Sequence, residues 1–498
     1  MGPGHITMMQ TVHILDPILP NSPGMADQGS ILCKSSSLIS HKVIADCHEE
    51  STVVESRLSL SSDRPIAVSG HENYILLDDG RHILDACGGA GVACIGHGNK
   101  EVIEAMVAQA MNISYVPWGF FENSAKLALS EWFSSTSGGH FNKVYITCSG
   151  SEAIEGAMKL AREYFVWKGE MERVKFISRD ESYHGITLGS LSLGGHMSRR
   201  APFEELLLSN VHRIPACNAY RQRLDGEPDT LYVARKAQEL EDMFRRLEPG
   251  TVIAFIAEPV VGAASGCIPA VPGYFQAMKS VCDRYGALFI LDEVMCGMGR
   301  TGTNHAWEQE GVLPDIQTIG KGLSGGYQPV SAILVGPKIH QEMQDRNVTF
   351  THGHTYQDHP LGCAAALKVQ EIITGDNLLT NVREQGQNLE KLLRQRVGDH
   401  PHVGDIRGRG LFWGIEFVEN KQTKMPFDPS LQVAQRVHKA AMASPSDMAI
   451  YYGQGCAGDQ QGDHIMIMPP YNVDSRTIEV IVEKAVAAIH QVFAAVSG

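Results

Sequence analysis

The chain has 498 residues, and its 42 Lys plus Arg against 56 Asp plus Glu give a formal net charge of −14 at pH 7. This charge argues against nucleic acid as the main partner, because no basic stripe is available to neutralise phosphates. The apolar fraction of 43% and the charged fraction of 20% argue against a disordered or fibrous chain. The 11 cysteines form no CxxC pair, so we expect reduced thiols in a cytoplasmic protein.

The sequence shows no targeting or membrane signal. No apolar run reaches the roughly 18 residues that suggest a transmembrane helix. The first residues lack both the charged start and the long apolar core of a secretory signal. We therefore expect no membrane partner. Residues 1–50 contain Pro, Gly and Ser without a sustained period, which predicts an irregular N-terminal lead.

Regular patterns begin near residue 74. Two short apolar runs, 74–77 and 82–84, flank Asp78-Asp79-Gly80, which is a hairpin signal. Helical patterns follow at 100–111 and 122–135. Apolar and β-branched runs then predict strands at 143–148, 174–178, 251–257, 287–291, 316–319 and 330–335. Helices are predicted between several of them, at 152–167, 232–247 and 274–285. This alternation predicts an α/β fold with a large, mainly parallel central sheet covered on both faces.

The pattern changes after about residue 360. Helices are predicted at 362–374, 383–396 and 475–496, with short strands near 403–418. This mixture is typical of a smaller α+β C-terminal domain. We therefore predict an irregular lead at 1–50, a segment at 51–100 that packs on the small domain, a large domain at 101–355 and a small domain at 356–498.

Polar residues directly follow four of the predicted strands. They are the segment 149–151 (Ser-Gly-Ser), Glu258, Asp292 and Lys321. In an open parallel sheet, ligands bind outside the carboxyl ends of the strands. The sequence therefore predicts an anion-binding turn, two carboxylates and one lysine at a single edge of the sheet.

The turn at 149–151 and Asp292 each allow two interpretations. Ser149 and Glu152 fit a helix-capping box, but a glycine between hydroxyls at a strand-to-helix turn also presents free N–H groups to a phosphate. Asp292 ends an apolar strand, where a carboxylate needs a cation or strong donors. On its own it fits an ordinary ion pair or cap better than a counter-charge for a protonated ring nitrogen, which is the functional alternative.

Lys321 and Tyr183 also allow a functional interpretation. Lys321 lies among glycines after an apolar strand, where partial desolvation makes its amine a nucleophile for aldehydes; a solvated surface lysine is the alternative. Tyr183 fits a ring that stacks on a planar cofactor, or an ordinary core aromatic. A phosphate-binding turn, a stacking ring, a ring-nitrogen carboxylate and an aldehyde-binding lysine are together what pyridoxal 5′-phosphate requires.

Over roughly residues 60–490 the chain resembles the class III aminotransferases. These are fold-type-I pyridoxal-phosphate enzymes that include omega-amino-acid and diaminopelargonate transaminases. The motifs that carry the resemblance are Gly150-Ser151-Glu152-Ala153 with Lys159-Leu160-Ala161-Arg162, Tyr183-His184-Gly185, Ala257-Glu258-Pro259-Val260-Val261-Gly262, Leu291-Asp292-Glu293-Val294 with Gly299-Arg300-Thr301-Gly302, Gly320-Lys321-Gly322-Leu323, Thr355-Tyr356 with His359-Pro360, and Arg407-Gly408-Arg409-Gly410-Leu411.

The resemblance implies a role for each matching residue. Lys321 is similar to the lysine that forms the Schiff base, and Asp292 to the partner of the pyridine nitrogen. Tyr183 and Val294 are similar to the residues on the two faces of the ring. The remaining implied cofactor contacts are those of Gly150, Ser151, His184 and Thr355.

The resemblance also implies contacts beyond the cofactor. Thr355 is similar to the threonine that reaches the phosphate of a neighbouring subunit, which implies a homodimer. Arg407 is similar to an arginine that clamps a substrate carboxylate, with Glu258 beside it. Trp118 fits a substrate pocket or, equally, the core. Many members have Gln at Val261, so contacts of that amide cannot be transferred.

These residues predict a ping-pong transaminase that moves an amino group from an amine or amino acid to a keto acid or aldehyde. Lys321 acts as general base and acid. A pyridoxal-phosphate aminomutase or decarboxylase on the same scaffold is the nearest alternative, because fold does not fix the reaction. A non-catalytic relative of the fold is more remote. An NAD-dependent dehydrogenase is disfavoured, because Gly89-Ala90-Gly91 continues with Cys94 instead of glycine.

A metal site is not expected. His352, His354 and His359 lie close together in the sequence, but no cysteine or carboxylate stands near them at ligand spacing.

Overall fold

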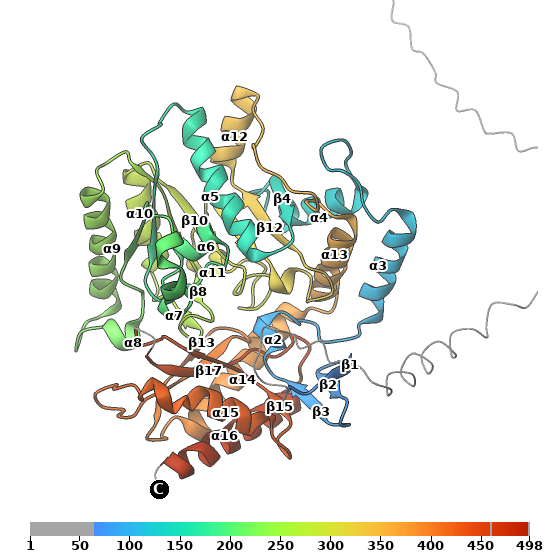
Figure 1. Ribbon diagram of the computed structural model, residues 1–498, viewed down its shortest axis with the longest axis vertical. Helices are drawn as coiled ribbons and strands as arrows, with labels where there is room; N and C mark the ends of the chain where they lie inside the picture. The colour runs from blue at the N-terminus through green and yellow to red at the C-terminus, as the bar shows by residue number, and fades with distance from the viewer. Residues whose placement is uncertain (1–63, 459–460, 497–498) are drawn as a thin grey trace, which may run out of the picture. The chain divides into compact units, whose positions relative to one another are not determined.

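The computed structural model describes residues 64–458 and 461–496, so the predicted irregular lead at 1–50 lies outside the described residues. The described residues from Pro65 onward belong to one compact unit. Its centre is a sheet of seven strands (Figure 1). In spatial order the strands are β4 (Lys143–Thr147), β12 (Ser331–Val335), β11 (Ile316–Ile319), β10 (Leu288–Asp292), β7 (Val252–Ala257), β5 (Lys175–Arg179) and β6 (Val211–Ile214).

The sheet is mainly parallel, as predicted, with one strand reversed. β12 is antiparallel to both β11 and β4, whereas the other neighbouring pairs are parallel. Residues 320–330 between β11 and β12 contain only a short 3₁₀ turn, and a parallel return needs a longer crossover that usually contains a helix. The reversal brings the start of β12 to the edge where the parallel strands end. The short strand β6 was not predicted, because half of its residues are His and Arg and it lacks an apolar run.

Apolar residues alternate between the two faces of the central strands. On β10, Leu288 and Ile290 pack in a cluster with residues of α5 (Gly150–Trp167). Phe289 and Leu291 pack on the opposite face, in a cluster with α9 (Asp229–Arg246) and α10 (Tyr274–Arg284). Because both faces are covered, β10 is buried along its whole length. Polar groups at its end are therefore withdrawn from solvent.

The C-terminal part of the chain forms a second sheet with its own helices. The antiparallel strands are β13 (Val403–Gly408), β14 (Trp413–Phe417), β17 (Asp463–Ile467) and β16 (Tyr451–Gln454). Among the helices that contribute to its core are α14 (Leu378–Val397), α15 (Val433–Met442) and α16 (Ser475–Val496). Figure 1 shows them, orange to red, apart from the helices around the central sheet. None of the helices within the described ranges is long and apolar enough to cross a bilayer.

The predicted hairpin is present, and it joins the C-terminal part of the chain. β1 (Ala67–His71), β2 (Tyr74–Leu77) and β3 (His82–Asp85) form a sheet with β15 (Met448–Ala449), which pairs in parallel with β3. This pairing is consistent with a segment at 51–100 that packs on the small domain, although residues 51–63 lie outside the described ranges. The division into these four segments stays a prediction.

The remaining elements connect or cover these sheets. α13 (Pro360–Gly375) packs against α3 (Lys100–Asn112) and α4 (Ser124–Thr136). The short elements are α2 (Gly88–Gly91), α6 (Leu188–Leu193), α7 (Met197–Arg200), α8 (Ala219–Gln222), β8 (Val260–Val261), β9 (Ile268–Pro269), α11 (Trp307–Glu310), α12 (Pro337–Arg346) and the 3₁₀ turns η1 (Ala201–Leu206), η2 (Lys321–Leu323) and η3 (Pro429–Leu431).

Candidate active site

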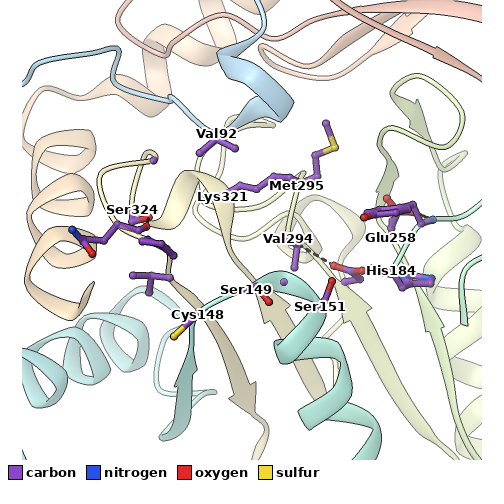
Figure 2. A pocket seen from close by; sticks show the side chains of 18 residues that line it. Val92, Cys148, Ser149, Ser151, His184, Glu258, Val294, Met295, Lys321 and Ser324 are labelled. Carbon is purple, nitrogen blue, oxygen red and sulfur yellow. Dashed lines mark hydrogen bonds and ion pairs between the residues drawn. The ribbon is translucent and has the colours of Figure 1, made fainter. Parts of the chain in front are cut away.

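A cavity of about 380 Å³ lies at the edge where the parallel strands of the central sheet end. The segment 149–151 after β4, Glu258 after β7, Asp292 at the end of β10 and Lys321 after β11 all line it. Figure 2 shows the Lys321 side chain extended across this pocket, between Val92 and Val294. The structure thus brings together all four segments that the sequence placed at one edge.

Lys321 has unusual backbone and side-chain surroundings. Its φ of +46° lies in the left-handed region, which costs free energy for a residue other than glycine. In the part of the chain that the structure describes, its amine has no hydrogen bond or ion pair. Burial lowers the pKa of Lys321, although the carboxylates of Asp292 and Glu258 oppose this shift. A larger share of the amine is therefore neutral and nucleophilic near pH 7.

Asp292 is held by three donors on one side of the cavity. Its side chain is only 4% exposed. Oδ2 lies 2.7 Å from His184 Nδ1, and Oδ1 accepts hydrogen bonds from the Val294 N–H at 3.1 Å and the Thr318 hydroxyl at 3.3 Å. Nε2 of His184 is buried without a partner among the described residues. This arrangement fixes a carboxylate where it can stabilise a cationic group of a ligand.

The turn after β4 combines a helix cap with an anion-binding surface. Ser149 caps α5, because its hydroxyl accepts the Glu152 N–H at 3.2 Å, as the capping interpretation requires. That cap leaves the N–H groups of Gly150 and Ser151, which have no partners within the helix, at its positive end. A Cβ on Gly150 would lie 2.7 Å from Cγ1 of Val294. A side chain here would displace Val294, so glycine is favoured and the backbone is open to an anion.

Glu258 positions the loops around the cavity. Oε1 accepts the Tyr183 N–H and Oε2 accepts the Gly262 N–H, both at 3.0 Å. Burial raises the pKa of Glu258, an effect that Asp292 increases and His184 opposes. The Tyr183 ring lines the cavity and packs against an apolar cluster on the loop after β7. Tyr183 is therefore held in place through both its backbone and its ring.

Other lining residues have no type that signals function. Val92, Met295, Ser324 and Gln328 complete the wall. Met295 and Ser324 follow Asp292 and Lys321 by three residues, and this proximity is the only signal in the sequence that marks them.

Arg407 lies outside this cavity. On β13, its guanidinium donates to the backbone oxygens of Gly266 and Ser265 and to the carboxylates of Asp405 and Glu416. Burial lowers the pKa of Arg407, but the carboxylates, Glu416 first, more than reverse this effect and keep the group charged. All three of its nitrogens are thus used within the protein.

Trp118 and Thr355 also lie away from Lys321. The Trp118 indole is 41% exposed and donates to the backbone oxygen of His354 at 3.0 Å, beside a different cavity. Thr355 is exposed and does not line the cavity around Lys321. Neither residue is among those that line the cavity around Lys321, and their predicted roles stay predictions.

One of the three neighbouring histidines has unexpected partners. Ligand atoms of His354, Cys148 and Glu152 all lie within 4.8 Å of one another. Cys148 and Glu152 are about 200 positions away in the sequence, so local spacing did not reveal them. Glu152 also accepts the Cys148 N–H at 2.8 Å, which gives its carboxylate a structural role.

Comparison with known proteins gives the family of the chain. The model of the class III aminotransferases matches residues 61–489. An aminotransferase of Gibberella zeae is 48% identical over 85% of this chain and 83% of its own length. The diaminobutyrate–2-oxoglutarate transaminase of Halomonas elongata is 34% identical over 85% and 90%. The solved omega transaminase of Pseudomonas jessenii in complex with PMP has a TM-score of 0.82 and 30% identity, covering 89% of this chain and 96% of that chain.

The chain belongs to the class III aminotransferases, and its fold is that of the fold-type-I transaminases. It is an aminotransferase, of a family that depends on pyridoxal phosphate.

Proposed function

We propose that the cavity around Lys321 binds pyridoxal 5′-phosphate and catalyses a ping-pong transamination. When bound, this cofactor supplies an aldehyde that captures amines and a ring that accepts electrons from the substrate carbon. Lys321 would hold the aldehyde carbon through its amine, and Asp292 would face the ring nitrogen. Gly150 and Ser151 would bind the phosphate, while Tyr183 and Val294 would lie on opposite faces of the ring.

The observation that carries the proposal is the unpartnered amine of Lys321 in the same cavity as the Asp292–His184 pair and the open helix start at Gly150. An amine that is withdrawn from water without a partner is costly. Its pKa is lowered by burial, which favours the neutral form that attacks a carbonyl. The cavity thus offers one group for each part of the cofactor.

The residues of the chain then have separate tasks. Once displaced by the incoming amine, Lys321 would take a proton from the substrate carbon and return it, as general base and acid. Asp292 would keep the ring nitrogen protonated, held in place by His184. Glu258 would keep the Tyr183 backbone fixed beside the reacting atoms.

A homodimer is part of this proposal. Thr355 is exposed and does not line the cavity of its own chain, which supports a contact with the phosphate of a second subunit. Large apolar side chains are also exposed, at Met111, Phe120, Phe121 and Tyr356. A cytoplasmic location is supported by the cysteines of the described residues, all of which are free.

The substrates belong to the proposal as well. We expect an amine or amino acid as donor and a keto acid or aldehyde as acceptor. The Halomonas elongata relative acts on diaminobutyrate and 2-oxoglutarate, so these two compounds are the first to assay. An aminomutase or decarboxylase is the alternative, which product analysis separates.

The test is to mix the purified protein with pyridoxal 5′-phosphate and record the visible absorption band before and after borohydride. We expect a borohydride-sensitive band, and amino-group exchange with 2-oxoglutarate or pyruvate. Lys321→Ala should lose both, whereas the exposed Lys391→Ala on α14 should keep both. Exchange by Lys321→Ala at the parental rate, or release of CO2 without exchange, would contradict the proposal.

A further inference from the structure

A second cavity, of about 330 Å³, lies beside the first one. Arg199 at the end of α7, His196, Ala263 and Tyr451 are among its lining residues. The guanidinium carbon of Arg199 is 5.0 Å from the centre of the Tyr183 ring, which lines the first cavity. Tyr451 packs in the same apolar cluster as Met295, which also lines the first cavity. Tyr183 and Met295, which line the first cavity, therefore pack against residues that line the second.

The side chain of Arg199 has free donors. It is exposed, and within the described ranges it forms no hydrogen bond or ion pair. Contact with the Tyr183 ring uses the face of the guanidinium. The N–H groups on its edge stay available, in the planar fork that matches a carboxylate.

Neighbouring cations do not compete with it. Arg200 is buried, and its Nη1 donates to three backbone oxygens of the segment 191–194. Burial, together with Arg199, lowers the pKa of His196 to about 4, so this imidazole is neutral near pH 7. Among the described residues that line the two cavities, Arg199 is the one arginine. Arg407, by contrast, uses its donors within the protein.

We propose that Arg199 binds the carboxylate of the amino-acid donor and of the keto-acid acceptor, in the second cavity and across the Tyr183 ring from Lys321. This inference rests on the proposed transamination. It specifies that the substrates carry a carboxylate and are not simple amines. The charge of Arg199 also acts on Lys321, whose pKa it lowers in addition to the larger effect of burial. The geometric link between the two groups is Tyr183, whose ring contacts the guanidinium of Arg199 and lines the cavity that holds Lys321.

The kinetic test compares amino acids with the amines that lack their carboxylate: β-alanine with ethylamine, and 4-aminobutyrate with propylamine. For Arg199→Met we expect kcat/KM for the amino acids to fall by about 10- to 100-fold, mainly through KM, because a charged hydrogen-bond pair is lost. For the amines, kcat/KM should change less than about twofold, because these donors have no carboxylate to contact Arg199. Arg199→Lys should restore part of the loss. The exposed Arg476→Met, on α16, is the matched control.

A binding test is independent of turnover. Succinate, which has carboxylates but no amino group, should bind the cofactor-loaded wild type in a calorimetric titration and bind Arg199→Met at least about 10-fold more weakly. Equal losses for amines and amino acids, unchanged selectivity, or no succinate binding to the wild type would overturn the assignment. If no donor exchanges its amino group with the wild type, the proposed transamination fails, and the succinate titration still decides the role of Arg199.

Discussion

Two cations have opposite surroundings: half-buried Lys321 at the edge of the central sheet and buried Arg407 in the C-terminal sheet. Lys321 has no polar partner among the described residues, and its pKa is lowered by burial. Arg407 contacts two carboxylates and two backbone oxygens, and its pKa is raised by Glu416 and Asp405 against the effect of burial. A cation without a partner costs stability and is available for chemistry, whereas a saturated one contributes to the structure. The comparison predicts how substitutions at each site divide between activity and stability.

The largest effect is expected at Lys321. Lys321→Ala should lower the rate of amino-group exchange by at least about 10³-fold, because the general base is lost. Its free energy of unfolding, measured by denaturant titration of the cofactor-free protein, should not fall, because no contact of the amine is lost. A loss of stability comparable to that of an Arg407 variant would remove the contrast between the two sites.

Arg407→Met should behave in the opposite way. It leaves the carboxylate of Glu416, which is fully buried, with Arg221 as its remaining cationic partner. We expect the free energy of unfolding to fall by about 3 kcal/mol, with a smaller change in the activity of the folded fraction. The double variant with Glu416→Gln should lose less than the sum of the two single variants. Additive losses would mean that the two side chains are not coupled.

Glu293 is a buried carboxyl group whose surroundings lie between these two extremes. It follows Asp292, and its carboxylate accepts the N–H groups of Ala306 and Trp307 at 2.6 and 2.8 Å. Burial raises its pKa from 4.5 to about 8, although these hydrogen bonds lower it. The folded state therefore holds a proton that the unfolded state has already released. The stabilising contribution is complete below pH 4.5 and is lost as the pH rises through about 8.

The measurement is the free energy of unfolding against pH for the wild type and Glu293→Gln. Between pH 4.5 and about 8 the wild type should lose about 1.4 kcal/mol per pH unit relative to the variant. Parallel curves would show that Glu293 does not change its protonation on folding.

The smallest effect is expected at Gly150. Gly150→Ala places a Cβ 2.7 Å from Val294 Cγ1, so it should cost about 1 kcal/mol of stability and weaken cofactor binding. Adding Val294→Ala should recover part of the stability. Gly375→Ala at the end of α13 meets no atom within 4 Å and should be neutral or slightly stabilising. Equal behaviour of the two single variants would argue against a tight turn at Gly150.

Strand ends were the most predictable part of the molecule. The apolar runs that become β4, β7, β10 and β11 are fixed by local composition, and a common direction brings the residues after them to one edge. The antiparallel direction of β12 depends on its short connection from β11 and on its pairing with β11 and β4. The apolar runs in the sequence show neither of these.

Partners supplied by distant segments could not be predicted. The saturation of Arg407 depends on backbone oxygens of Ser265 and Gly266, about 140 positions away. The N–H groups of Arg199 are free because its guanidinium packs against the Tyr183 ring and no described residue accepts a hydrogen bond from its side chain. Both are properties of packing between loops, whereas the sequence shows only that each residue is an arginine.

The pairing of β3 with β15 has a consequence for the order of assembly. Leu84 and Met448 are partners in this ladder although more than 360 positions separate them. Contacts so distant in sequence close late, because the loop entropy must be overcome first. During synthesis on the ribosome, the edge of β3 in the hairpin therefore stays unpaired until the segment that contains β15 has emerged.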